Sequence, residues 1–243
     1  LIEDTTREGA DEFMHMDEYI DVLVPRGSAG LIKATKKNAT IPVIETGAGN
    51  CHLYMEKTGD LSVAEKILIN GKLQRPGVCN ALESMLIDRD ILAKAAPVLL
   101  GALAERNVTI HACAETIAAC PELADKLIPA TEDDYAREYL GYEISCKAVS
   151  GVDEAIAHIN KYGTHHSEVI ITNDESAADK FLREVDSSAV YVNASTRYTD
   201  GFEFGFGAEL GISTQKLHVR GPIGPEQLTS FKYVIHGNGQ CRK

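Results

Sequence analysis

The sequence predicts an α/β fold, in which a mostly parallel sheet carries helices on both faces. Short apolar runs of strand type alternate with longer amphipathic stretches along most of the chain. Glycine, proline and polar residues mark the junctions between these stretches. A chain of 243 residues, 44% of them hydrophobic, can bury the core that such a sheet needs. Alternating strands and helices favour parallel pairing with helices covering the sheet.

The predicted elements follow in chain order. Residues 8–19 are rich in acidic side chains and have the spacing of a helix. An apolar run of strand type follows at 20–24, then a glycine-rich turn at 25–30 and a helix from about Leu31. The stretch 61–69 is typical of an amphipathic helix, because its apolar residues recur at helical spacing. Further strands are predicted at 41–44, 51–55, 81–87, 108–112, 144–149, 168–172, 189–193 and 229–236, and further helices at 89–107, 113–123, 153–162 and 176–185.

Charge and hydropathy argue against several classes of protein. The net charge of −12 argues against a nucleic-acid-binding surface, which needs a basic face, so an anionic substrate would require a local basic patch. No run approaches the roughly 18 apolar residues of a membrane span. The first residues have neither a basic start nor an apolar signal core. We therefore expect a cytoplasmic protein without nucleic-acid or membrane partners.

The metal-ligating residue types show no binding pattern. Six cysteines are spread without CxxC pairs, so neither a zinc site nor a disulfide framework is predicted. His165 and His166 are adjacent but have no carboxylate or cysteine at ligand spacing. We assign no metal.

Cys79 is the candidate nucleophile. Pro76 and Gly77 predict a turn, and an apolar run begins after Ala81, so the thiol lies at or beside the start of a helix or strand. Unpaired backbone N–H groups there, and the helix dipole if the element is a helix, would favour thiolate over thiol. The alternative is that Cys79 is a small buried hydrophobe, and spacing alone favours that alternative.

The residues around Cys79 resemble a known family. The segment Gln-Arg-Pro-Gly-Val-Cys-Asn-Ala-Leu-Glu at 74–83 is similar to the catalytic-cysteine segment of the gamma-glutamyl phosphate reductases, which belong to the aldehyde dehydrogenase superfamily. The similarity continues through 20–27 and 185–197 and covers essentially the whole chain. It implies that the chain corresponds to the later part of the family and begins inside the cofactor-binding domain. The implied domains are a cofactor-domain remnant at 1–44, a catalytic domain at 45–210 and a C-terminal return segment with an oligomerisation strand at 211–243.

The resemblance implies NADPH-dependent reduction of L-glutamyl 5-phosphate to L-glutamate 5-semialdehyde in proline biosynthesis, through a thioester on Cys79. Arg75, four residues before the thiol, is a candidate phosphate contact, with a surface ion pair as the alternative. Asn80 and Asn193 are further candidates for substrate or phosphate contact. Arg197 lies in the loop 195–201, which follows a strand end, where open α/β sheets present ligand-binding loops. The resemblance implies that Arg197 holds the substrate's α-carboxylate.

Cofactor residues are implied in two places. Gly27 and Ser28 lie in the glycine-rich turn, whose backbone N–H groups can hold phosphate or nicotinamide, although an ordinary strand-to-helix turn is the alternative. Glu138 resembles the superfamily glutamate that holds the nicotinamide ribose, with a surface carboxylate as the alternative. Glu45 occupies the position of the superfamily's general base, but a reductase that releases phosphate needs no hydrolysis. We otherwise expect Glu45 to be a hydrogen-bonded loop carboxylate.

Two further expectations concern larger parts of the chain. The resemblance implies that the glycine-rich loop 205–211 closes over the active site and that the terminal strand makes a homo-oligomer contact; a flexible surface loop is the alternative for 205–211. The alternative function is a folded catalytic-domain fragment that binds NADPH weakly and does not turn over by itself, while Cys79 stays reactive.

Overall fold

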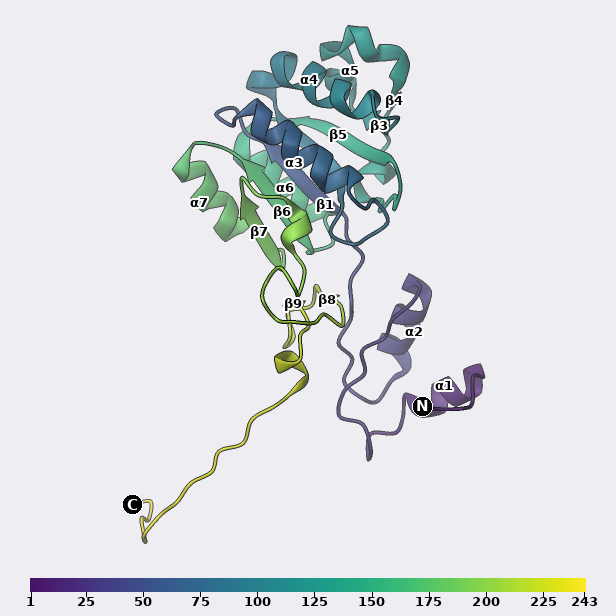
Figure 1. Cartoon of the computed structure of the whole chain (residues 1–243), viewed down its shortest axis with the longest axis vertical. Helices are drawn as coiled ribbons and strands as arrows, with labels where there is room; N and C mark the ends of the chain where they lie inside the picture. Colours follow the sequence, from purple (N-terminus) through teal and green to yellow (C-terminus); the bar gives the residue numbers. More distant parts are fainter.

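The computed structural model describes residues 1–243 apart from the side chain of Ala29. Its centre is a seven-stranded sheet in the order β4-β3-β5-β2-β1-β6-β7 (Figure 1). All neighbouring pairs in this sheet are parallel. The strands are β1 (Cys51–Met55), β2 (Leu82–Asp88), β3 (Thr109–Ala112), β4 (Leu127–Pro129), β5 (Glu143–Val149), β6 (Ser167–Ile171) and β7 (Ala189–Val192).

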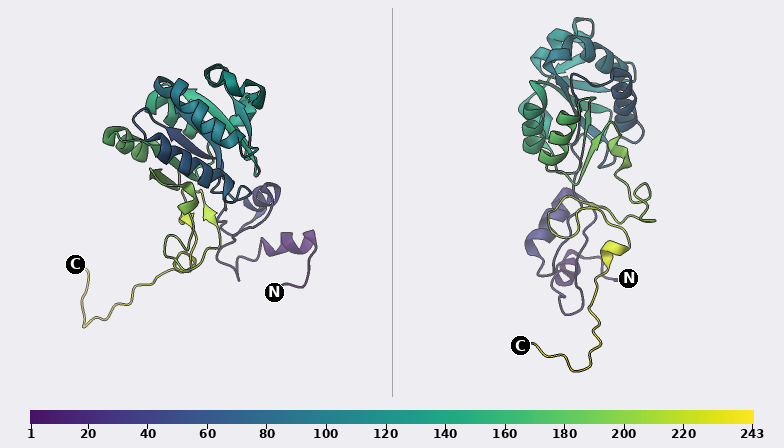
Figure 2. Two further views of the ribbon diagram at one scale, coloured as in Figure 1. Left: turned by 45° about the horizontal axis from the view of Figure 1, so that its top comes forward. Right: turned by 90° about the vertical axis from the view of Figure 1, so that its left-hand side faces the viewer.

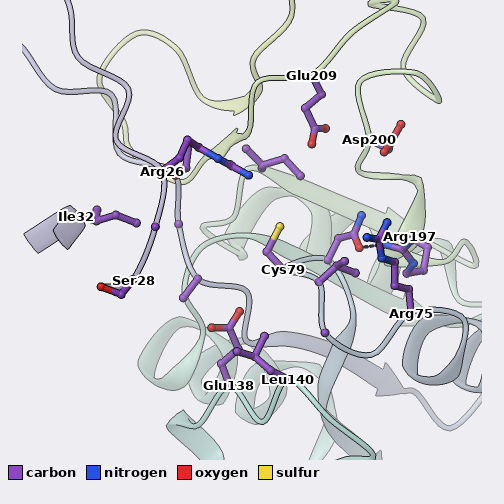
Figure 3. Close-up of a pocket in the computed structure, with 18 residues that line it drawn as sticks. Arg26, Ser28, Ile32, Arg75, Cys79, Glu138, Leu140, Arg197, Asp200 and Glu209 are labelled. Atoms are coloured by element: carbon purple, nitrogen blue, oxygen red, sulfur yellow. Dashed lines mark hydrogen bonds between the residues drawn. The ribbon is translucent and has the colours of Figure 1, made fainter. Parts of the chain in front are cut away.

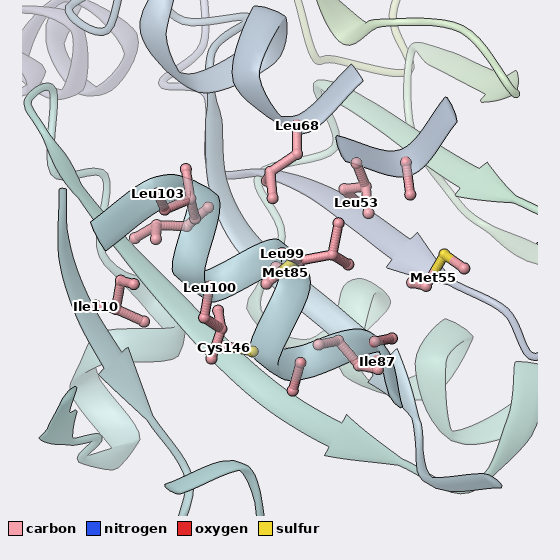
Figure 4. Close-up of a cluster of buried hydrophobic side chains, with 14 of the residues drawn as sticks. Leu53, Met55, Leu68, Met85, Ile87, Leu99, Leu100, Leu103, Ile110 and Cys146 are labelled. Carbon is pink, nitrogen blue, oxygen red and sulfur yellow. The ribbon is translucent and has the colours of Figure 1, made fainter. Parts of the chain in front are cut away.

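Three helices cover one face of the sheet. They are α3 (Leu61–Leu73), α4 (Leu92–Ala104) and α5 (Ala114–Ala119). Leu68, Leu99 and Leu103 from these helices pack against strand residues such as Leu53 and Met85 in the larger apolar cluster (Figure 4). Fully burying side chains of this size stabilises the fold by about 2 kcal/mol each. This face is therefore the main core of the molecule.

Two helices cover the opposite face, so the sheet lies between two helical layers (Figure 2). They are α6 (Gly151–Tyr162) and α7 (Glu175–Glu184). Because side chains alternate along a strand, Leu53 of β1 faces the first layer, whereas Tyr54 packs in the second. The Tyr54 ring stacks on Phe181, and its hydroxyl donates to Asp88 Oδ2 at 3.0 Å.

The N-terminal and C-terminal segments pack together beyond one edge of the sheet (Figure 1). They contain α1 (Arg7–Phe13), α2 (Ala29–Asn38) and the short antiparallel pair β8 (Ile212–Ser213) and β9 (Gly221–Pro222). A bridge joins Thr46 to Ser213, and a small apolar cluster joins the two segments; its members are Val24, Ile44, Val219 and Ile223. The remaining helical turns are η1 (Arg89–Ile91), η2 (Pro121–Lys126), η3 (Glu132–Ala136), η4 (Thr196–Tyr198) and η5 (Glu226–Leu228).

Several predicted elements differ from the structure. The strands predicted at 20–24 and 41–44 are reduced to one bridge, Leu23 with Val43, because no further strand lies beside either one among the described residues. The helix predicted at 8–19 ends at Phe13, and the one predicted at 89–107 begins as a 3₁₀ turn. The strand predicted at 229–236 has no partner within the chain: the tail after Leu228 is extended and solvent-exposed, with no neighbouring strand among the described residues.

Within the described residues, none of the helices is both long enough and apolar enough to cross a lipid bilayer.

Candidate active site

A cavity of about 660 Å³ opens at the edge of the sheet where β1, β2 and β5 begin (Figure 3). Ala48, Cys79 and Leu140 line it, and each precedes one of these strands. The expectation that ligand loops gather at the carboxyl ends of the strands is therefore wrong here. The loop after β7 folds back to the amino edge, where Thr199 Oγ1 lies 2.7 Å from Ser167 Oγ at the start of β6.

The cavity brings together most of the residues proposed from the sequence. Those that line it are Gly27, Ser28, Arg75, Cys79, Asn80, Glu138 and Arg197. With Arg26, the lining holds three arginines in a chain of net charge −12. The carboxylates of Glu138, Asp200 and Glu209 line it as well, so the arginines supply local cationic groups for an anionic ligand without making the whole cavity basic.

Cys79 lies in a turn that leads into strand β2 rather than into a helix. The dipole of a helix beginning at Cys79, one of the two sequence-based alternatives, is therefore absent. Burial and the carboxylates of Glu209 and Glu138 raise the pKa of Cys79 to about 11, while Arg26 acts in the opposite direction. The backbone N–H of Cys79 also favours thiolate, as expected, but burial outweighs it. The structure does not show the expected bias toward thiolate, because burial favours the neutral thiol.

The backbone around Cys79 is held by close contacts. A Cβ added to Gly49 would lie 1.4 Å from the Cys79 carbonyl oxygen, so only glycine permits this approach. The Cys51 thiol donates to the same carbonyl at 3.2 Å. The Gly49 N–H donates to Glu138 Oε1 at 2.6 Å. Through Gly49, the position of the Cys79 turn is thus coupled to that of Glu138.

Arg197 is positioned by neutral side chains. Its Nε donates to Gln74 Oε1 at 3.0 Å, and its Nη1 donates to Asn80 Oδ1. Asn80 is itself fixed, because its Nδ2 donates to the Thr199 carbonyl at 2.9 Å. Burial lowers the pKa of Arg197, and the charge of Arg75 acts in the same direction. Two guanidinium groups that repel each other in one cavity form a site for an anion.

The cavity has two chemically different sides, which Cys79 separates (Figure 3). Arg75, Arg197 and Asp200 lie on one side of the sulfur. Ser28, Ile32 and Glu138 lie on the other. A group held at the thiol would therefore have Arg75, Arg197 and Asp200 on one side, and Glu138 and the start of α2 on the other.

Comparison with known proteins agrees with this geometry. No protein-family model matches the chain. A curated relative named gamma-glutamyl phosphate reductase, from Clostridium botulinum (strain Alaska E43 / Type E3), is 55% identical over 242 residues, which are 100% of this chain and 58% of the relative. The crystal structure of gamma-glutamyl phosphate reductase from Thermotoga maritima matches with a TM-score of 0.95 at 48% identity, over 100% of this chain and 57% of that one.

This chain is homologous to the gamma-glutamyl phosphate reductases. It spans less than two thirds of the length of these relatives, 58% of the first and 57% of the second.

More distant structures share the fold alone. An acetylating aldehyde dehydrogenase from Geobacillus thermoglucosidasius has a TM-score of 0.71 at 18% identity, over 98% of this chain and 61% of that one. An engineered glycolyl-CoA reductase with bound NADP+ has a TM-score of 0.62 at 16% identity, over 88% of this chain and 56% of that one. The fold expected from the sequence, an aldehyde dehydrogenase-like α/β fold, is confirmed.

Two of the residues named from the sequence lie outside the cavity. Asn193 binds the backbone of Thr172: its Oδ1 accepts from the N–H at 3.0 Å and its Nδ2 donates to the carbonyl at 2.8 Å. These bonds join β6 to β7 and leave the Asn193 amide engaged with backbone, so we withdraw it as a substrate contact. Glu45 pairs with Lys36 at 2.6 Å, which fits the alternative of a loop carboxylate held by a neighbour.

Sequence reasoning missed two carboxylates that line the cavity, Asp200 and Glu209. Glu209 Oε2 accepts from the Gly201 N–H at 2.8 Å, and burial raises the pKa of Glu209. Glu209 belongs to the glycine-rich loop 205–211, where Gly205 and Gly207 have φ of 80° and 72°. The glycines indicated a loop, but the direction of a loop side chain depends on tertiary contacts that no local pattern encodes.

Proposed function

We propose that the protein reduces L-glutamyl 5-phosphate to L-glutamate 5-semialdehyde and phosphate, with NADPH as reductant, as a step of proline biosynthesis. The observation that carries this proposal is Cys79 between an arginine pair and a cofactor-like turn, in a chain 55% identical to a named gamma-glutamyl phosphate reductase. An acyl phosphate suits a thiol beside arginines, because its leaving group is an anion.

The first chemical step forms a thioester. Glu209, whose raised pKa makes it a better proton acceptor, takes the proton from the Cys79 thiol. The sulfur then attacks the acyl carbon, the bond from that carbon to the phosphate oxygen breaks, and phosphate leaves with both electrons. Arg75 lies on the leaving-group side of the sulfur and is exposed, so it can pair with the phosphate. Arg197, which lies on the same side of the sulfur, holds the α-carboxylate of the substrate.

The residues on the opposite side of Cys79 fit a nicotinamide cofactor. Ser28 caps α2, with its Oγ accepting from the Leu31 N–H at 3.3 Å, and Gly27 has a φ of 150°. Glu138 is fixed through Oε1 by Gly49, and no hydrogen bond within the described residues engages its Oε2, which can accept from a ribose hydroxyl. When bound, NADPH would supply a hydride.

Cys79 also completes the reaction. When a hydride is added to the thioester carbon, the carbonyl oxygen would take the proton that Glu209 accepted in the first step, which leaves a thiohemiacetal on the sulfur. Its carbon–sulfur bond breaks to give the aldehyde and a thiolate, while the hydroxyl proton passes to Glu209. Proton transfer from Glu209 then restores the thiol, and burial favours that neutral form.

We also propose that the tail forms a homo-oligomer contact, in a protein of the cytoplasm. Phe231 is 80% exposed and Ile235 87% exposed, in an extended segment that leaves the rest of the fold (Figure 1). An extended apolar segment offers its backbone to the sheet edge of another copy.

A phosphate-release assay tests the proposed function on this chain without any cofactor. Mixing the protein with L-glutamyl 5-phosphate is expected to release about one equivalent of phosphate per chain in a burst, because the thioester accumulates. Cys79→Ser should remove the burst. Asn193→Ala, a change outside the cavity, should keep it. Equal phosphate release from the wild type and Cys79→Ser would overturn the proposal.

A further inference from the structure

Asp200 places a negative charge on the arginine side of the cavity (Figure 3). Its Oδ1 accepts from the N–H groups of Phe202 at 2.9 Å and Glu203 at 3.3 Å. These bonds cap the turn that follows. No hydrogen bond among the described residues engages Oδ2, so one oxygen of the carboxylate remains for a ligand.

The nearby arginines do not neutralise Asp200. Arg197 is held by the amide oxygens of Gln74 and Asn80, both of them neutral. Within the described chain, neither Arg197 nor Arg75 makes an ion pair with a carboxylate at 4.0 Å or less. The charge of Asp200 does act on Arg197, opposing the fall of its pKa, so the two groups are neighbours that remain apart. A cavity with separate cationic and anionic groups is complementary to a zwitterion.

We propose that Asp200 determines substrate specificity by accepting the α-ammonium group of the substrate, while Arg197 takes the α-carboxylate on the same carbon. This inference rests on the proposed function, which supplies an amino-acid head group. A substrate without the ammonium would leave a partly buried carboxylate desolvated and unpaired, and a site built around a polar group rejects such analogues strongly. Asp200 thus selects glutamyl over glutaryl compounds.

The variant Asp200→Asn separates this role from turn capping. An asparagine Oδ1 can accept from the same two N–H groups, so the turn is kept while the charge is lost. The matched control is Glu203→Gln, which removes a charge three residues away from a side chain that does not line the cavity but borders a neighbouring groove together with Arg197. Both variants should melt within a few degrees of the wild type.

The experiment measures how well small ligands protect Cys79 from iodoacetamide. The ligands are L-glutamate, 4-aminobutyrate, which lacks the α-carboxylate, and glutarate, which lacks the ammonium. In the wild type, L-glutamate is expected to give half-protection at a concentration about tenfold below that of glutarate. Asp200→Asn should raise the half-protection concentrations of L-glutamate and 4-aminobutyrate about tenfold and lower that of glutarate, because the unpaired carboxylate that penalises glutarate is gone. Glu203→Gln should behave as wild type.

Two outcomes would count against these ideas in different ways. Equal protection by L-glutamate and glutarate in the wild type, or an L-glutamate value unchanged by Asp200→Asn, would overturn the role of Asp200 and leave the proposed function standing. No protection by any of the three ligands would overturn the substrate class itself, and the role of Asp200 with it.

Discussion

The Cys79 thiol lies among opposing charges. Burial raises its pKa most, Glu209 and Glu138 raise it further, and Arg26 lowers it, so the thiol is mostly neutral at physiological pH. Below a pKa of about 11, the thiolate fraction rises about tenfold per pH unit. The rate at which Cys79 is alkylated should therefore increase with pH from 7 to 10 without reaching a plateau.

Removing single charges near Cys79 tests whether these side chains set the pKa of its thiol. Glu209→Gln removes a negative charge, so it should lower the pKa of Cys79 and speed alkylation several-fold at pH 8. Arg26→Ala should slow it. Peptide mapping after timed exposure to iodoacetamide gives both rates, and Cys241, exposed in the tail, is the internal control. Identical Cys79 rates in the three proteins would show that these side chains do not set the reactivity.

A second residue links stability to pH. His158 is buried between the rings of Tyr135, Tyr162 and His52, and neither ring nitrogen has a partner among the described residues. Burial lowers the pKa of His158 to about 3. Between this value and the ordinary 6.5, only the unfolded chain binds the proton, so stability falls as pH drops below 6.5.

The change His158→Phe should flatten that dependence. Phenylalanine keeps the aromatic packing and loses no hydrogen bond of the described residues. At pH 5 the variant should be about 2 kcal/mol more stable relative to wild type than at pH 7.5, which urea unfolding at the two pH values measures. If stability depended on pH as steeply in the variant as in the wild type, a group other than His158 would cause the dependence, and buried His166 would be the next candidate.

At the scale of elements, the site depends on three loops that meet at the amino edge of the sheet, before β1, β2 and β5. The loop before β1 brings Gly49 against the Cys79 carbonyl, and its N–H binds Glu138 in the loop before β5. Buried Lys72 of α3 pairs with Glu83 of β2 at 2.6 Å, and Glu83 also accepts from the Leu140 N–H at 3.2 Å. Both sides of the cavity are thus fixed by the same sheet edge.

Gly49→Ala should disturb this arrangement more than a helical glycine replacement does. Its Cβ would overlap the Cys79 backbone, so the turn must shift, and we expect a loss of about 2–3 kcal/mol with a changed rate of Cys79 alkylation. Gly101→Ala in α4 is the control, since a Cβ there meets no atom within 4 Å and alanine favours helix by about 1 kcal/mol. Equal thermal melting of the two variants would contradict the close-approach argument.

On the scale of the whole molecule, the tail makes no contribution to the core. Removing residues 229–243 should leave the melting temperature unchanged, because these side chains are exposed. Self-association should weaken, since Phe231, Tyr233 and Ile235 would be lost as contacts. Sedimentation measures the association state of the full chain and of the shortened chain. A shortened chain that associates as strongly as the full one would place the contact elsewhere.

The sheet could be predicted from the sequence because its strands are buried on both faces and appear as continuous apolar runs, as at 82–88 and 167–171. β4 was missed, since three residues that include Pro129 carry no periodicity. The strand predicted at 20–24 was wrong because a strand forms only beside a neighbouring strand, and a local sequence pattern does not show whether one is present.

The candidate site was predictable only in part. The resemblance around Cys79 named residues from four distant segments that the structure brings into one cavity. Spacing alone favoured a buried cysteine, and the pKa of Cys79 follows from burial and from Glu209, which a turn motif does not reveal. Asp200 and Glu209 were missed because long-range folding of their loop, not local sequence, places them at the cavity.

The most direct test of the account is the position of the acyl group after reaction with L-glutamyl 5-phosphate. Peptide mapping by mass spectrometry should find a glutamyl adduct on the peptide that contains Cys79, and hydroxylamine should remove it, as it removes thioesters. Pre-treatment with iodoacetamide should prevent the adduct. A hydroxylamine-sensitive adduct on Cys51, Cys113 or Cys241 with Cys79 unmodified, or no adduct at all, would contradict the central claim that Cys79 is the nucleophile.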